Sequence, residues 1–116
     1  MFVKNNERTG SGYIEFQFCK KKKAYFLNNL VGYKFWSDDS IYLDVDDLEN
    51  KLINLYHILK NIDPDFSIVD ISYFDKEQTI SFLEDVEKLN DNNLEVLEEF
   101  FKTAIEKYNG IYIIGV

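Results

Sequence analysis

The apolar residues follow two different spacings in two parts of the chain: every second residue within 13–18, and every third or fourth residue within 48–62. Residues 13–18 alternate between apolar and polar side chains, which is typical of a half-buried strand. Between residues 48 and 62 the apolar residues step by three or four, which places them on one stripe of a helix. A chain that opens with strands and groups its helices later is expected to form an α+β domain.

Local signals indicate where these elements begin and end. Pro64 removes a backbone donor, so it ends the first helix, which begins near Asp44. Asp75 and Gln78 have the spacing of a capping box at the start of a second helix. The pair at 109–110, Asn-Gly, is a helix stop. The expected elements are strands at 13–18, 24–27, 30–36, 41–43, 67–73 and 111–116, and helices at 45–62, 75–89 and 94–108.

The order of these elements, β-β-(β)-α-β-α-α-β, predicts how they pack. We expect a mostly antiparallel sheet with about three helices packed on one face. The last segment, 111–116, is a continuous apolar run, so a buried C-terminal strand is expected to return to the sheet. A length of 116 residues with 46% apolar residues fits one domain with a real core, so residues 1–116 are expected to form a single domain.

Charge is divided unevenly along the chain. Residues 1–36 have a balance of +5 and residues 37–116 a balance of −13, which together give the net charge of −8. A domain with this acidic majority repels nucleic acid and anionic membranes, and it attracts basic partners. The sequence therefore argues against binding to nucleic acid or to a membrane surface. The simpler alternative is that the acidity only keeps a small protein soluble.

Acidic and aromatic residues gather between positions 36 and 49. Carboxylates can bind a divalent cation, but the spacing lacks the glycine and the distal glutamate of an EF-hand loop. They are also typical of a turn followed by a helix N-terminus. A third interpretation is a recognition surface for a basic protein, because Trp and Tyr are frequent at interface hot spots. The residues expected to contact such a partner are Trp36, Asp38, Asp39, Tyr42, Asp44, Asp46, Asp47 and Glu49.

No residue pattern in the chain indicates catalysis, a cofactor or a metal. His57 lies within a predicted helix without identifiable partners, and Cys19 has no identifiable base. Lys20–Lys23 could bind phosphate, but a run of lysines between two strands also suits the tip of a hairpin. The sequence contains no glycine-rich phosphate loop, zinc ligand set or nucleophile elbow. We therefore expect a protein that is not an enzyme and that needs no cofactor.

Cysteine content and hydropathy predict a cytoplasmic protein. One cysteine cannot form an intramolecular disulfide. The first residues lack the apolar stretch of a secretory signal, and no apolar run approaches the roughly 20 residues that span a bilayer.

The stretch DISYFDKEQTISFLEDVEKL (70–89), together with the size, acidity and β-then-α order, resembles bacterial immunity proteins of polymorphic or contact-dependent toxin systems. The resemblance implies an inhibitor that binds a cognate toxin domain, often a nuclease, and covers its active site. Two alternatives remain: a phage or mobile-element protein that mimics nucleic acid to inhibit a DNA-binding enzyme, and a small enzyme that uses His57 or Cys19. As an immunity protein, the chain would meet a basic cleft with the carboxylates of 38–49 or with those of Glu84, Asp85, Glu87, Glu95, Glu98 and Glu99.

Overall fold

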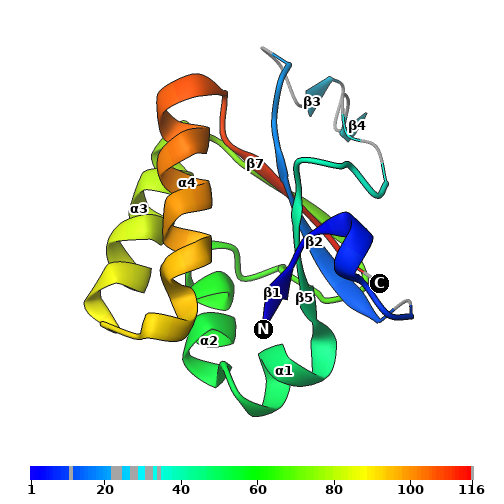
Figure 1. Ribbon diagram of the computed structural model, residues 1–116. Helices are drawn as coiled ribbons and strands as arrows, with labels where there is room; N and C mark the ends of the chain where they lie inside the picture. The colour runs from blue at the N-terminus through cyan, green and yellow to red at the C-terminus, as the bar shows by residue number, and fades with distance from the viewer. Residues whose placement is uncertain (11, 22–24, 27–28, 31–32, 34, 116) are drawn as a thin grey trace.

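The protein forms an α+β fold in which a five-stranded antiparallel sheet packs against four helices (Figure 1). This computed structural model describes residues 1–10, 12–21, 25–26, 29–30, 33 and 35–115. The sheet has the order β1-β5-β2-β7-β6. Its strands are β1 Phe2–Val3, β2 Tyr13–Phe18, β5 Ile41–Asp44, β6 Ile71–Phe74 and β7 Ile111–Ile114. The helices are α1 Val45–Asn50, α2 Ile53–Ile62, α3 Lys76–Lys88 and α4 Glu95–Lys107, with short 3-10 turns at Asn5–Glu7 and Asn92–Leu94.

The C-terminal strand lies inside the sheet, as its apolar sequence predicts. β7 pairs with β2 on one side and with β6 on the other, both in the antiparallel sense. All four residues of β7 are buried, because helices cover one face and a loop covers the other. The prediction of a returning C-terminal strand is therefore confirmed.

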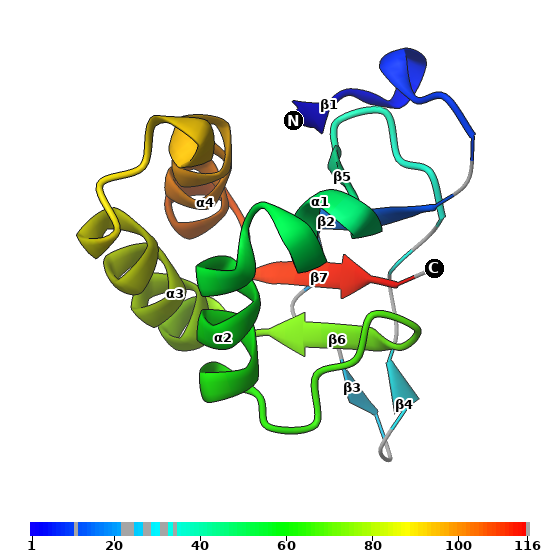
Figure 2. The same cartoon turned by 90° about the horizontal axis from the view of Figure 1, so that it is seen from below.

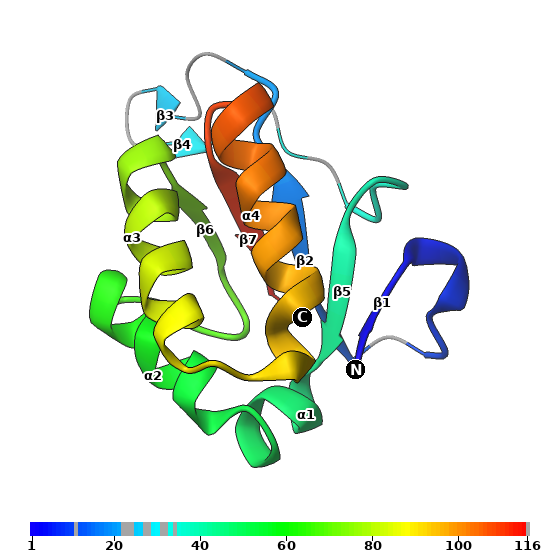
Figure 3. The ribbon, with the colours of Figure 1, turned by 60° about the vertical axis from the view of Figure 1, so that its left-hand side comes forward.

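All four helices lie on the same side of the sheet, and the core fills the space between the two layers (Figures 2 and 3). Phe16 of β2 and Phe101 of α4 meet edge to face, with ring centroids 6.3 Å apart. Phe82 of α3 completes this centre, 4.5 Å from Phe101. The predicted packing of the helices on one face is confirmed.

The predicted helix over 45–62 is two helices. The carbonyl oxygen of Asp47 accepts the N–H groups of both Lys51 and Leu52, each at 2.9 Å, and Leu52 leaves the helical region with φ −122° and ψ 45°. This break redirects the chain, so that α2 packs against α3 while Leu48 of α1 and Leu52 both remain buried. Periodicity alone could not show the break, because the apolar spacing continues through it.

The opening third of the chain also differs from the prediction. β3 Tyr25–Phe26 lies within the expected run 24–27, and β4 Asn29–Leu30 overlaps the run 30–36 at Leu30 alone. Among the described residues the two strands form a separate two-stranded sheet, outside the main sheet. Positions 24, 27, 31, 32 and 34 of those runs lie outside the described residues. β1, in a segment with no strand signal, takes an edge position beside β5, where Phe2 lies opposite Leu43.

The strand expected at 67–73 begins later, at Ile71. Residues 67–70 form a turn in which the N–H of Asp70 donates to the carbonyl of Ser67 at 3.2 Å. Val69, whose β-branched side chain suggested a strand, is 62% exposed on this turn. The remaining elements, α3 with its Asp75–Gln78 capping box and α4, lie within a residue of their predicted ranges.

The second face of the sheet is covered too, which corrects the expectation of a half-buried β2. Glu15 and Gln17, the polar residues of that strand, are 1% and 3% exposed. Tyr33 and the turn that follows it lie over this face, and the Tyr33 ring meets the Tyr112 ring of β7 at 6.1 Å. The turn over this face is the starting point of the candidate site.

Candidate partner-binding surface

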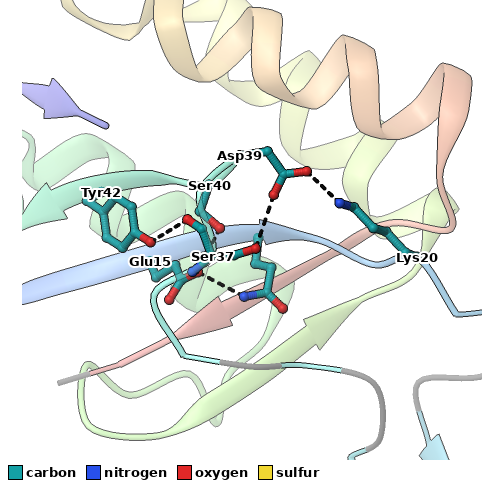
Figure 4. Close-up of polar contacts among 7 residues, drawn as sticks. Glu15, Lys20, Ser37, Asp39, Ser40 and Tyr42 are labelled. Carbon is teal, nitrogen blue, oxygen red and sulfur yellow. Dashed lines mark hydrogen bonds and ion pairs between the residues drawn. The ribbon is translucent and has the colours of Figure 1, made fainter. Parts of the chain in front are cut away.

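A buried carboxylate organises the turn at residues 36–40. Oε1 of Glu15 accepts the N–H of Trp36 at 2.8 Å, and Oε2 accepts the N–H of Ser37 at 3.0 Å. Oε2 also accepts the hydroxyl of Ser40 at 2.6 Å and the side-chain amide of Gln17 at 2.8 Å. Figure 4 shows Ser37 and Ser40 around the Glu15 side chain, on the strand below them. Four donors compensate the burial of this charge and hold the turn on the sheet.

Trp36 stands at the first position of this turn, in an unusual conformation. Its φ of 61° lies in the left-handed region, where bulky residues are rare and strained. Trp36 remains 42% exposed, and its indole stacks on the ring of Tyr42 with centroids 5.9 Å apart. The guanidinium of Arg8 lies 3.9 Å from the indole centroid and donates two hydrogen bonds to Asn5 Oδ1. Trp36 is therefore an exposed aromatic residue that is positioned by three contacts: Glu15 at its backbone N–H, and Tyr42 and Arg8 at its indole.

Two carboxylates follow Trp36 on the same turn. Asp38 is exposed and accepts the side-chain amide of Asn5 at 2.9 Å. Asp39 is half-buried, accepts Lys20 Nζ at 2.6 Å and accepts the hydroxyl of Ser37 at 3.1 Å (Figure 4).

The ion pair shifts the pKa values of both Asp39 and Lys20. Partial burial pushes the pKa of the Asp39 carboxyl upward, but the hydrogen bonds from Lys20 and Ser37 outweigh it and hold that pKa below its ordinary value. The same hydrogen bond raises the pKa of Lys20. Both groups are charged at neutral pH, so Asp39 is matched by a cation, and the exposed carboxylate of the turn is that of Asp38.

A groove begins at Asp39 and runs between α4 and the β5 side of the sheet. It has a volume of about 580 Å³. Phe18, Ile41, Val96 and Phe100 supply its apolar surface. Its polar lining comes from Asp39, Glu95, Glu99, Lys4 and Thr103. Volumes of roughly 300–1,000 Å³ are usual for sites that bury a small ligand or a few side chains.

The structure divides the predicted partner-contacting residues into two groups. Trp36, Asp38 and Asp39 precede β5, whereas the remaining four acidic positions lie at the other end of the strand (Figure 3): Asp44 is its last residue, and the other three are on α1. At that end Asp44 caps α1 by accepting the N–H of Asp46 at 2.8 Å, and Asp47 pairs with Lys51 at 3.3 Å, while Glu49 is exposed. The four-residue strand separates the two groups by roughly 13 Å.

Tyr42, also expected at the interface, is 0% exposed. Its hydroxyl donates to the carbonyl of Ser37 at 2.7 Å, and its ring supports the indole of Trp36. The expectation of direct contact with a partner is therefore wrong for this residue. It lies on the second face of β5, which the turn covers, and sequence alternation could not show that cover.

Other carboxylates belong to α3 and α4, among them Glu84, Asp85, Glu87, Glu95, Glu98 and Glu99. Among the residues that the structure describes, four ion pairs form, each with an exposed lysine, and most of the acidic side chains have no lysine within ion-pair distance. Exposed pairs of this kind contribute little to stability. The excess negative charge is thus available to solvent and to a partner.

Several residues of the surface were not indicated by the sequence. Glu95 and Glu99 belong to the alternative set on the later helices, but Arg8, Glu15 and Val96 carried no assigned role. One signal existed for Val96: it is an apolar residue on the polar side of α4, 49% exposed. Nothing in a single sequence shows that Glu15 points toward a covering turn.

Of the two residues considered for catalysis, Cys19 is buried and His57 lies on α2, away from this surface. Cys19 is 0% exposed, with its thiol 3.5 Å from the Tyr112 hydroxyl, and His57 is exposed on α2. Within the described part of the chain, no group of three or more His, Cys, Asp or Glu side chains could hold a metal ion. No helix among the described residues is long and apolar enough to cross a membrane.

Comparisons of the chain with protein-family models, with curated proteins and with solved structures found no match.

Proposed function

We propose that the protein is an immunity protein that binds a basic toxin domain and neutralises it by covering the active site. A nuclease is the class of toxin that we favour. The immunity protein would act in the cytoplasm of the cell that makes it, and it would need no catalytic group or cofactor. The observation that carries the proposal is Trp36: an exposed indole held in a strained backbone conformation by a buried carboxylate, next to two acidic residues. Strain of this kind is kept where a side chain must be presented in one position.

The chemistry around Trp36 suits a positively charged partner. Tryptophan is among the commonest interface hot spots, and a preorganised anchor loses little conformational entropy on binding. Asp38 and Asp39 would meet lysine or arginine at the rim of a basic cleft, and the net charge of −8 would speed the encounter. The family resemblance of residues 70–89 adds the expectation that the partner is a toxin domain.

Co-expression with the toxin tests the proposal. The natural candidate is the C-terminal domain of a secreted protein encoded immediately upstream, produced in a bacterial host with and without this chain. We expect that the domain arrests growth, that the chain restores growth, and that the two purify as a complex. If growth stays arrested and no complex forms with that domain, the proposal is wrong.

Variants at the turn locate the interface. Trp36→Gly removes the indole while glycine accepts the positive φ, so the fold is kept, and we expect the affinity to fall about 30-fold or more, the cost of losing a hot spot. Val69→Ala changes an exposed apolar residue on a remote turn and should leave the affinity unchanged. Equal effects of the two variants would exclude Trp36 as an anchor.

Charge reversal distinguishes the two ends of β5. Asp38→Lys, Asp46→Lys and Asp65→Lys each replace a negative by a positive charge at an exposed position: the first at the turn, the second on α1 and the third on a remote loop. We expect a clear loss of affinity only for Asp38→Lys. A loss confined to Asp46→Lys would move the interface to α1 and leave the proposed inhibitory function intact.

A further inference from the structure

The groove beside α4 has a firm apolar floor. The rings of Phe18 and Phe100 stack with centroids 4.1 Å apart and an interplanar angle of 14°, and the ring of Tyr108 also stacks on Phe18, at 4.7 Å. Ile41 and Phe100 are 2% and 5% exposed, so they are held by the core rather than by solvent-facing contacts. Val96 projects from α4 with about half of its surface exposed. An apolar side chain entering the groove would meet surfaces that are already in place.

Carboxylates predominate among the described lining residues of the groove, and one of them, Glu95, has no basic partner there. Asp39 stands at one side, and Glu95 and Glu99 stand one turn apart on α4. Glu99 has an exposed ion pair with Lys102 at 3.5 Å, and Asp39 pairs with Lys20. Glu95 pairs with no basic side chain in the described part of the chain. Lys4 is the single cation among the described residues of the lining, so carboxylates outnumber it.

We propose that this groove receives an apolar side chain of the partner that is flanked by lysine or arginine. The inference rests on the proposed function and adds the chemistry of the partner's contacting segment. The apolar residue would pack on Phe18, Val96 and Phe100 while the flanking cations reach the rim carboxylates. Asp39 is shared by the turn and the lining of the groove, so a partner that contacts Asp39 lies at the end of the groove.

Charge complementarity selects this occupant over a second copy of the chain. Two copies would bring together surfaces that share the same acidic rim, and each copy carries a net charge of −8. Like-charge contact of this kind opposes association. A basic segment, in contrast, gains both from burial of its apolar side chain and from neutralisation of the rim.

A peptide titration tests the groove without the toxin. The probe is a blocked five-residue peptide with a central leucine flanked by lysines, added at low ionic strength while backbone amide shifts are followed by NMR. We expect shifts centred on Ile41, Val96 and Phe100. Peptides with a central serine, or with glutamates in place of the lysines, should shift these amides far less.

Matched variants make the result specific. Glu95→Lys with Glu99→Lys should weaken binding of the leucine peptide about 10-fold, because it reverses the rim. Glu84→Lys with Glu87→Lys makes the same change in net charge on α3 and should weaken binding less than about 2-fold, by screened long-range attraction alone. Val96→Asp should also reduce binding of the leucine peptide, since it replaces an apolar lining residue that would contact the leucine by a charged one.

The outcomes separate this inference from the proposed function. Shifts spread over the whole surface, or equal losses in both pairs of variants, would overturn the groove as a site. So would a sedimentation experiment in which the chain dimerises and the rim variants make it monomeric. If groove variants still neutralise the toxin fully, the groove inference fails and the function stands; if the peptide binds but no toxin is neutralised, the reverse holds.

Discussion

At the scale of single residues, Glu15 connects the core with the candidate surface. It is a charged side chain on a central strand, and it is 1% exposed. Three of its four hydrogen-bond donors belong to the covering turn, and the fourth, Gln17, belongs to its own strand. If the turn moved off the sheet, the carboxylate would lose the three donors of the turn. Glu15 positions Trp36 without itself reaching solvent.

The first prediction concerns this carboxylate. In Glu15→Gln an amide N–H must face a backbone N–H of Trp36 or Ser37, whichever way the new side chain is turned. We expect a loss of about 2–4 kcal/mol in the free energy of unfolding, measured with urea. The amides of Trp36 and Ser37 should also exchange faster with solvent. Glu87→Gln, on the exposed side of α3, is the control and should stay within about 0.5 kcal/mol of the parent; an equally small effect of Glu15→Gln would contradict the role given to this residue.

Tyr42 gives a second, pH-dependent prediction. Burial raises the pKa of its phenol, and the nearby Glu15 carboxylate raises it further, against a smaller opposing effect of Arg8. In the unfolded chain the phenol ionises near its ordinary value of about 10. Above that pH the unfolded state loses a proton that the folded state keeps, so stability falls as pH rises.

We expect Tyr42 to contribute a slope of up to about 1.4 kcal/mol per pH unit above pH 10, measured by urea unfolding at several pH values. Tyr42→Phe removes this titration, so its stability should fall less steeply in the same range. At neutral pH it should be about 1 kcal/mol less stable, because the hydrogen bond to Ser37 is lost. Parallel alkaline slopes for the two proteins would refute the assignment.

At the scale of elements, the connection from α4 to β7 contains a glycine that is required by both the local backbone and a tertiary contact. The Asn-Gly pair at 109–110 is a helix stop in the sequence, and α4 does end at Lys107. Gly110 has φ 105°, and a Cβ there would collide with the carbonyl oxygen of Phe74 and lie 2.9 Å from the carbonyl carbon of Asp75. Glycine is needed at this position both for its backbone conformation and for the close approach of β6.

Two glycine variants separate these effects. Gly110→Ala must strain the backbone and displace the end of β6, so we expect a loss of more than about 3 kcal/mol, or failure to fold. Gly10 has a similar φ of 91° but open space around it, so Gly10→Ala should cost only about 1 kcal/mol. Unfolding in urea and the yield of soluble protein measure both. Similar losses in the two variants would show that the close approach at Gly110 is unimportant.

At the scale of the whole molecule, the excess of negative charge governs how the protein meets a partner. Most carboxylates of the described residues have no lysine within ion-pair distance, and Asp39 is shared by the turn and the groove. Salt shortens the range of such attraction, to about 8 Å at physiological ionic strength.

The last prediction follows from this screening. The association rate with the toxin domain should fall about 10-fold or more when salt is raised from 10 to 150 mM, as stopped-flow mixing would show. The dissociation rate should change little, because the Trp36 anchor is largely apolar. An association rate that is independent of salt would remove the electrostatic part of the proposal.

The sequence by itself determined the α+β class, the positions of α3, α4, β2 and β7, and the helix stop before Gly110, since each depends on neighbouring residues only. It also indicated Trp36, Asp38 and Asp39. Only the tertiary structure decided that Tyr42 is buried, that the acidic residues after β5 lie apart from those before it, and that Val96 and Glu95 line a groove with Asp39. These facts depend on which loop covers which face of the sheet. Such contacts join segments distant in sequence, so no local spacing encodes them.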